Sequence, residues 1–197
     1  MGLDYHYDNS PRDIQQQVFT RQLRLAIKAG KPLTIHTREA EEDTERILKA
    51  EVPKDWKIHI HCYTDSPEWA TRMLSHFPNL YIGITGVITY ATNLNTRIVA
   101  QQHPTRLLLE TDAPFMVPSN LAGSLAEVLG DPGVKNLRFP LSHSAMIPWT
   151  AEFVVGCLKD KPKGGERQGE DGEEEWTVER VMRVANENAK KVYGIQL

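Results

Sequence analysis

Residues Arg106 to Phe115 read RLLLETDAPF, and this stretch decides which fold we expect. Three consecutive leucines run into Glu110, Thr111 and Asp112, and the run stops at Pro114. A short apolar run that ends at a proline favours a buried strand over a helix. The stretch is therefore predicted to be a strand that carries an acidic side chain to its C-terminal end.

Two earlier stretches end in a similar way, but on a histidine. They are Pro32 to His36, which reads PLTIH, and Trp56 to His61, which reads WKIHIH. Three predicted strands thus present His36, His61 and Asp112 at their C-terminal ends. Histidine together with a carboxylate is a donor set that suits zinc, manganese or magnesium in hydrolytic enzymes.

Helical patterns alternate with the predicted strands. We expect helices over about residues 10–30, 39–50, 67–77, 92–102, 148–158 and 177–193, and a further strand over residues 79–84. Short links between strands and helices indicate parallel strands that are covered by helices. The fold class we predict is α/β, of the (β/α)8 TIM-barrel type, with residues 1–197 forming a single domain.

Three segments receive more specific predictions. The first helix is expected to bury one apolar stripe made by Ile14, Val18 and Leu25, with Phe19, Leu23 and Ala26 beside them. The Gly-, Pro- and Ser-rich residues 117–143 are expected to form a long loop. Residues 159–175, KDKPKGGERQGEDGEEE, are of low complexity and highly charged, which predicts a mobile charged insertion.

The polar residues of the three key strands should share one face, because side chains two apart on a strand point the same way. They are Thr34, His36, His59, His61, Glu110 and Asp112. The opposite face is apolar and should pack against helices. The polar face then lies inside the barrel, where active sites occupy the C-terminal ends of the strands. His59 and Glu110 lie one layer deeper and are expected to have a structural or orienting role.

Each of these residues also has a plain structural explanation. A strand histidine is often held by a hydrogen bond in the core, and an aspartate before Ala-Pro is often a turn former. The occurrence of all three at strand ends favours the metal site.

Composition narrows the class of protein further. The chain has 197 residues and a formal net charge of -3, which does not suit a surface that binds nucleic acid by bulk positive charge. Cys62 and Cys157 are too few for a disulfide framework. The sequence contains no apolar run of the roughly 20 residues that a membrane helix needs. We therefore expect a cytoplasmic or nuclear location and no membrane partner.

Five motifs resemble, in this order and spacing, the TatD family of metal-dependent deoxyribonucleases. They are GLDYH (residues 2–6), IHTREA (35–40), HCYTDS (61–66), IGITGVITY (82–90) and LLLETDAPF (107–115). The resemblance implies a TIM-type barrel that binds two divalent ions, Mg, Mn or Zn, and hydrolyses the phosphodiester bonds of a DNA substrate. By similarity, His36 and His61 match two metal-binding histidines, and Asp112 matches a metal-binding aspartate that could also take the proton of the attacking water.

The sequence departs from the family pattern in two ways. The family's His-x-His strand and the Glu expected immediately before Met1 are not in the sequence, so we expect an N-terminally truncated chain with about the last five of eight barrel strands. In addition, Tyr63 to Asp65 replace the usual Phe-Ser-Gly, and Leu141 to Phe153 replace a basic Arg-Gly-Lys pattern. Both replacements leave the preferred substrate open.

Three functions follow from these observations. The leading one is a metal-dependent DNA hydrolase, impaired by the loss of N-terminal ligands. The second is a hydrolase of amides, esters or lactones on the same type of barrel, because fold does not fix substrate. The third is a catalytically inactive binding or scaffold protein. Metal identity, the mode of cleavage and the oligomeric state stay open.

Overall fold

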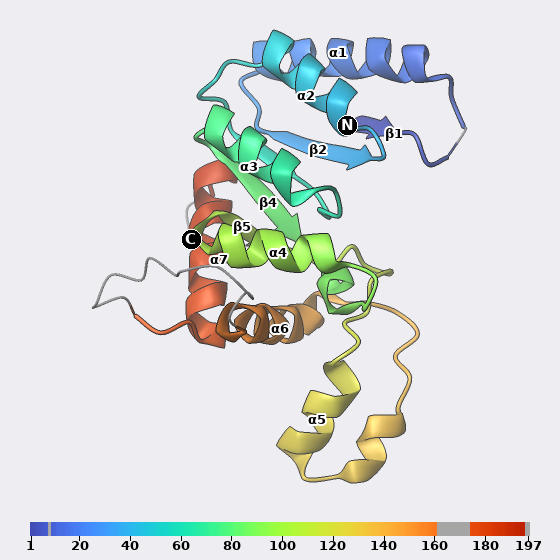
Figure 1. Ribbon diagram of the computed structural model, residues 1–197, viewed down its shortest axis with the longest axis vertical. Coiled ribbons are helices and arrows are strands. Elements are labelled where there is room, and N and C mark those ends of the chain that lie inside the picture. The colour runs from blue at the N-terminus through green and yellow to red at the C-terminus, as the bar shows by residue number, and fades with distance from the viewer. Residues whose placement is uncertain (8, 161–173, 196–197) are drawn as a thin grey trace.

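The computed structural model describes residues 1–7, 9–160 and 174–195, and most of the predicted charged insertion lies outside them (Figure 1). The described strands form one parallel five-stranded sheet in the order β1-β2-β3-β4-β5. Their bounds are β1 (Gly2–Asp4), β2 (Leu33–Arg38), β3 (Ile58–Ile60), β4 (Leu80–Ile84) and β5 (Leu107–Leu109). The predicted α/β fold with parallel strands is confirmed.

The first four helices connect successive strands, as the alternating pattern predicts, and three more helices of the described residues follow β5. They are α1 (Arg12–Lys28), α2 (Glu41–Glu51), α3 (Pro67–His76), α4 (Leu94–Gln102), α5 (Leu121–Leu129), α6 (Ile147–Lys159) and α7 (Val178–Tyr193). In the described residues no helix combines the length and the apolar character needed to cross a membrane.

Helix α3 begins where the sequence signals place it. The Ser66 side chain accepts a hydrogen bond from the Trp69 N–H, and Pro67 occupies the first turn. A proline fits there because the first amide groups of a helix have no partner within the helix. Ser66 therefore caps α3, and the helix begins at Pro67, the first residue of the predicted range.

The core lies between one face of the sheet and the surrounding helices. Apolar side chains of the strands, such as Ile35, Ile60 and Ile82, are fully buried there. Phe19 of α1 and Trp69 of α3 pack into the same cluster. This confirms that the apolar face of the strands points outward toward the helices and leaves the polar face on the inside.

Helix α7 contacts both sides of the sheet. Val181, in its first turn, belongs to the main core, whereas Val192 packs with Tyr81 and Leu108 in a small second cluster. Between them, the Asn188 side chain donates hydrogen bonds to the carbonyl oxygens of Thr105 and Leu107, at 2.9 and 2.8 Å. The C-terminal end of α7 therefore reaches the inner face of the sheet, beside β5.

Two predictions about segments are wrong. Residues 117–143 are not one loop, because they contain α5 and a short 3-10 helix (Pro132–Asn136) that project together from the rest of the molecule (Figure 1). Apolar residues at helical spacing outweigh the Gly and Pro content of this segment, and Gly130 ends α5 with a φ of 65°. In α1, the prediction is wrong for Ile14, Val18 and Leu25, which are 43%, 49% and 57% exposed, whereas Phe19 and Leu23 of the same predicted stripe are buried as expected.

Candidate metal centre

The site is built where β2, β3 and β5 end. The N–H of His61 donates to the Ile35 carbonyl at 2.8 Å, which places His61 and His36 on neighbouring strands at one level. Each of these chain segments then turns through a residue with positive φ: Glu39 at 54°, Cys62 at 47° and Asp112 at 53°. Such values are uncommon outside glycine and concentrate at functional sites. Three strand ends thus bend sharply at the same edge of the sheet.

Two of the strands end earlier than the sequence predicts. The ladder of β3 stops at Ile60 and that of β5 at Leu109, so His61 and Asp112 lie just beyond regular structure. The backbone pairing nevertheless continues for one residue, since Glu110 N–H donates to the Ile84 carbonyl at 2.9 Å. His61 is therefore held by paired backbone at the end of β3, whereas Asp112 follows two residues after the last paired residue of the β5 segment, Glu110.

The imidazole of His61 lies between two carboxylates. Its Nδ1 is 2.5 Å from Oε2 of Glu110, and its Nε2 is 3.4 Å from Oδ1 of Asp112. The hydrogen bond to Glu110 raises the pKa of His61 against the opposing effect of burial, and the charge of Asp112 adds to it. A carboxylate on Nδ1 orients a histidine with Nε2 free for a metal, so Nε2 and Asp112 form a pair of donors for a cation.

Glu110 is the centre of the hydrogen-bond network around His61. Burial by itself raises the pKa of this carboxyl, but the contacts with His59 and His61 outweigh it and bring the pKa to about 2. The backbone N–H of Cys62 also donates to Oε1 at 2.8 Å. Glu110 is thus a carboxylate at neutral pH, and its oxygens hold the residues on either side of the β3 end.

His59 lies one layer below His61, as predicted. Its side chain is 7% exposed, and its Nε2 is 3.3 Å from Oε1 of Glu110, in an orientation outside hydrogen-bond geometry. Gly83 of β4 makes room for this pair, because a Cβ at that position would collide with both Glu110 and His59. The orienting or structural role expected for His59 and Glu110 agrees with this arrangement.

His36 has a different partner in this structure. Its Nε2 is 3.1 Å from Oδ2 of Asp4, and its side chain is 45% exposed. Burial of Asp4 favours a higher pKa, but the hydrogen bonds from His36 and from the Tyr7 and His6 amides lower it overall. His36 therefore faces β1, and the structure does not bring it together with the pair formed by His61 and Asp112.

The donors present fit part of a metal centre. Histidine nitrogen and carboxylate oxygen are suitable ligands for divalent zinc, manganese or magnesium. Among residues 1–7, 9–160 and 174–195, however, no group of three or more His, Cys, Asp or Glu side chains is arranged to hold an ion. His61 and Asp112 supply two converging donors, and His36 becomes a third only if its Nε2 leaves Asp4.

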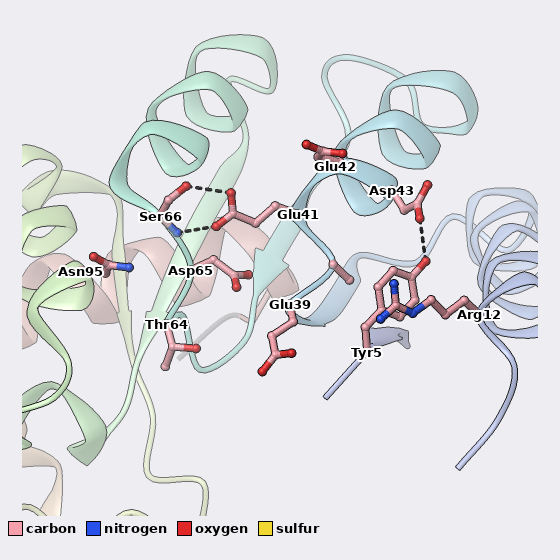
Figure 2. Close-up of a pocket in the computed structure, with 11 residues that line it drawn as sticks. Tyr5, Arg12, Glu39, Glu41, Glu42, Asp43, Thr64, Asp65, Ser66 and Asn95 are labelled. Atoms are coloured by element: carbon pink, nitrogen blue, oxygen red, sulfur yellow. Dashed lines mark hydrogen bonds between the residues drawn. The ribbon is translucent and has the colours of Figure 1, made fainter. Parts of the chain in front are cut away.

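A separate acidic pocket of about 560 Å³ lies beside the site. Figure 2 shows two contacts at its border, Glu41 with Ser66 and Tyr5 with Asp43, and Asp65 beside the first of them. Burial is the main cause that raises the pKa of Asp65 to about 7, and the charge of nearby Glu41 adds to it. The pocket contains none of His36, His61 and Asp112, so it is not the predicted metal site.

Three residues of the network are not among those that sequence reasoning selected as site residues. Asp4 belongs to the motif GLDYH, but no spacing indicates that it pairs with His36. Gly83 lies in the motif IGITGVITY, where a glycine inside a strand is a signal for close approach of a neighbour. Tyr193 contacts His59 across 134 positions of the chain, and no local pattern reports a contact of that separation.

A parallel sheet whose strands end in histidine and carboxylate side chains defines the class of (β/α) barrels with a metal site. The family model described as TatD related DNase matches residues 1–194. The chain belongs to the TatD family, as the motifs indicate.

Relatives of known name agree with this assignment. The chain is 45% identical over 129 residues to human "3'-5' RNA nuclease TATDN2", covering 64% of this chain and 17% of that protein. It is 31% identical over 196 residues to the "Uncharacterized metal-dependent hydrolase YabD" of Bacillus subtilis (strain 168), covering 99% and 64% of the two chains. With the "Deoxyribonuclease Tat-D" of Schizosaccharomyces pombe it shares 38% identity over 120 residues, covering 58% and 36%. The chain thus spans less than two thirds of the length of these relatives.

Solved structures of similar fold support a partial barrel. An uncharacterized amidohydrolase from Saccharomyces cerevisiae superposes with a TM-score of 0.73 at 19% identity, covering 98% of this chain and 63% of that one. The TatD homologue YJJV from Escherichia coli gives a TM-score of 0.66 at 22% identity, covering 100% and 62%. The five parallel strands and their helices therefore correspond to part of a larger barrel.

Proposed function

We propose that this chain belongs to a metal-dependent hydrolase of nucleic-acid phosphodiester bonds. The observation that carries the proposal is the pair formed by His61 Nε2 and Asp112 Oδ1, which are 3.4 Å apart. The other ring nitrogen of His61, Nδ1, is hydrogen-bonded to Glu110. Membership of the TatD family and relatives that are named as nucleases support the choice of bond.

Each residue has a defined task in this proposal. His61 and Asp112 hold a divalent ion, and His36 joins them after turning from Asp4. The ion, when bound, lowers the pKa of a water molecule and offsets the charge that develops on the phosphate. Asp112 would also take the proton of the attacking water on its carboxylate. Glu110 keeps the His61 ring in one orientation, so that Nε2 stays available as a ligand.

DNA is the substrate we expect from the sequence motifs, and RNA is the second candidate. The 45% identity to a human protein named as an RNA nuclease is the observation that favours RNA. The free thiols of Cys62 and Cys157 fit a reducing compartment, so we place this activity in the cytoplasm or the nucleus.

The test uses end-labelled DNA and RNA oligonucleotides of one sequence, with Mn²⁺ or Mg²⁺. We expect the 197-residue chain to cleave in a metal-dependent manner. In the His61→Ala variant the rate of cleavage should fall by about 100-fold or more, because removing a ligand weakens metal binding more than removing a residue that only orients a ligand. His76→Ala is the matched control, since α3 ends at His76 just before β4 begins, at the opposite end of the sheet.

Two results would contradict the proposal. One is cleavage of an amide, ester or lactone substrate with none of DNA or RNA, which would favour the second type of hydrolase. The other is the absence of any hydrolysis together with no uptake of Mn²⁺ in calorimetry, which would favour a catalytically inactive binding protein.

A further inference from the structure

The hydroxyl of Tyr193 reaches the buried layer beneath the metal-binding pair. Tyr193 is the last residue of α7, and its hydroxyl oxygen lies 2.6 Å from Nδ1 of His59 and 3.1 Å from Oγ1 of Thr34. These partners belong to β3 and β2, on the inner face of the sheet. One hydroxyl thus connects the end of the C-terminal helix to two strands.

The surroundings of His59 determine the direction of these hydrogen bonds. Its Nε2 is buried, has no hydrogen-bond partner, and lies 3.3 Å from a carboxylate oxygen of Glu110. In a neutral ring with the proton on Nδ1, the lone pair of Nε2 would face that negative charge. The proton therefore belongs on Nε2, so the hydroxyl of Tyr193 donates to Nδ1 and accepts from Thr34.

Glu110 connects the fixed ring of His59 to the ring of His61. The oxygen of Glu110 near His59 also accepts from the Cys62 amide, and its other oxygen accepts from Nδ1 of His61 at 2.5 Å. Space for the carboxylate exists only because Gly83 has no side chain. A continuous series of polar contacts thus runs from Tyr193 through His59 and Glu110 to His61.

We propose that Tyr193 is a positioning residue of the metal centre. By fixing the His59 ring it fixes the Glu110 carboxylate, and Glu110 in turn keeps Nε2 of His61 facing Asp112. The proposal rests on the proposed function in one respect, which is that a divalent ion is the ligand of His61. The orientation of the His61 ring can be measured without the ion.

The first test compares the affinity for Mn²⁺, measured by titration calorimetry, between the wild-type chain and Tyr193→Phe. We expect a loss of about 3- to 10-fold, the effect of one hydrogen bond on an equilibrium constant. Tyr5→Phe is the matched control, because the Tyr5 hydroxyl also has two side-chain partners, Asp43 and Gln16, at the β1 end of the sheet. It should leave the affinity unchanged.

A double-mutant cycle separates positioning from general destabilisation. Glu110→Gln should weaken Mn²⁺ binding by about 10- to 100-fold, the usual effect of an orienting partner. If Tyr193 acts through Glu110, adding Tyr193→Phe to Glu110→Gln should reduce the affinity no further. Additive losses in the double variant would overturn the proposed route.

The second test needs no metal. In ¹⁵N spectra of the histidine rings of the metal-free chain, Tyr193→Phe should shift the ring signals of both His59 and His61, whereas Tyr5→Phe should shift neither. Unchanged His61 signals would overturn the positioning role, even in a variant that folds normally. A wild-type chain that takes up no Mn²⁺ would count against the proposed function, and the His61 signals would still decide the role of Tyr193.

Discussion

At Gly83, strand β4 has no side chain, and His59 of β3 and Glu110, the residue just after β5, approach this position from the neighbouring strands. The space is filled by these two polar side chains, which approach the position that a Cβ would occupy. A buried carboxylate and a buried imidazole have little freedom to move aside, because each is held by other hydrogen bonds. Room at this one position is therefore a condition for the network that orients His61.

Gly83→Ala should destabilise the chain for this reason. We expect the free energy of unfolding to fall by about 1–3 kcal/mol, the usual cost of overpacking a core, measured by urea denaturation. Gly123→Ala in α5 is the control, since a Cβ there meets no heavy atom within 4 Å and alanine favours a helix by up to about 1 kcal/mol. Equal stability of Gly83→Ala and wild type would show that the pair can rearrange.

Asp65 makes the stability of the fold depend on pH, and a single substitution can remove this dependence. Its pKa in the folded chain is about 7, raised by burial and by the charges of Glu41 and Glu39, against an ordinary value of 3.8. Between these two values the folded state binds more protons than the unfolded state, so stability falls as the pH rises, by at most about 1.4 kcal/mol per pH unit.

Asparagine at this position cannot ionise. The Asp65→Asn variant should therefore gain stability relative to wild type as the pH rises from 5 to 8, as measured by urea denaturation of both proteins at each pH. A difference between the two proteins that is the same at pH 5 and pH 8 would contradict a raised pKa in the folded state.

At the scale of elements, α7 contacts the β5 segment through hydrogen bonds of the Asn188 side chain as well as through apolar packing. Asn188 is 3% exposed, and its amide donates to the carbonyl oxygens of Thr105 and Leu107. Leu107 begins β5 and Thr105 lies in the short 3-10 helix (Pro104–Arg106) just before it, so one side chain satisfies two backbone acceptors where the last strand starts. The position of Tyr193, one and a half turns further along the same helix, depends on this attachment.

Asn188→Ala should lower the free energy of unfolding by about 1–3 kcal/mol, because it leaves buried acceptors without a donor. Asn186→Ala is the control from the same helix, since Asn186 is exposed and should change the stability by no more than about 0.5 kcal/mol. Thermal or urea unfolding of both variants provides the comparison. Similar losses from the two substitutions would show that helix propensity, and not the bond to β5, sets the effect.

Local signals predicted some elements better than others. Helix α3 begins at the Ser66-Pro67 signal because capping depends on neighbouring residues only. The buried face of α1 was predicted only in part: Phe19 and Leu23 are buried as expected, whereas the tertiary environment leaves Ile14, Val18 and Leu25 exposed. Helix α5 was missed because glycine and proline content outweighed its apolar spacing.

At the scale of the whole molecule, the alternation of strands and helices was enough to predict the sheet. Parallel strands joined by helices place all C-terminal ends at one edge, which is how His61 and Asp112 could be assigned to one site from sequence. The pairing of His36 with Asp4 was not predictable, because it depends on side-chain conformation at the β1 end of the sheet. The same holds for Tyr193, whose position is determined by how α7 crosses the sheet.

The contact between His59 and Tyr193 also has a consequence for synthesis of the chain. The two residues are 134 positions apart, so the ribosome completes β3 long before it adds the hydroxyl that holds the His59 ring. Until α7 has left the ribosome and packed on β5, the polar side chains of the inner face lack the hydrogen bond from the Tyr193 hydroxyl to His59. Nascent chains that have not yet reached α7 should therefore expose an unfinished polar layer to chaperones and proteases, and the layer closes only after α7 has been made.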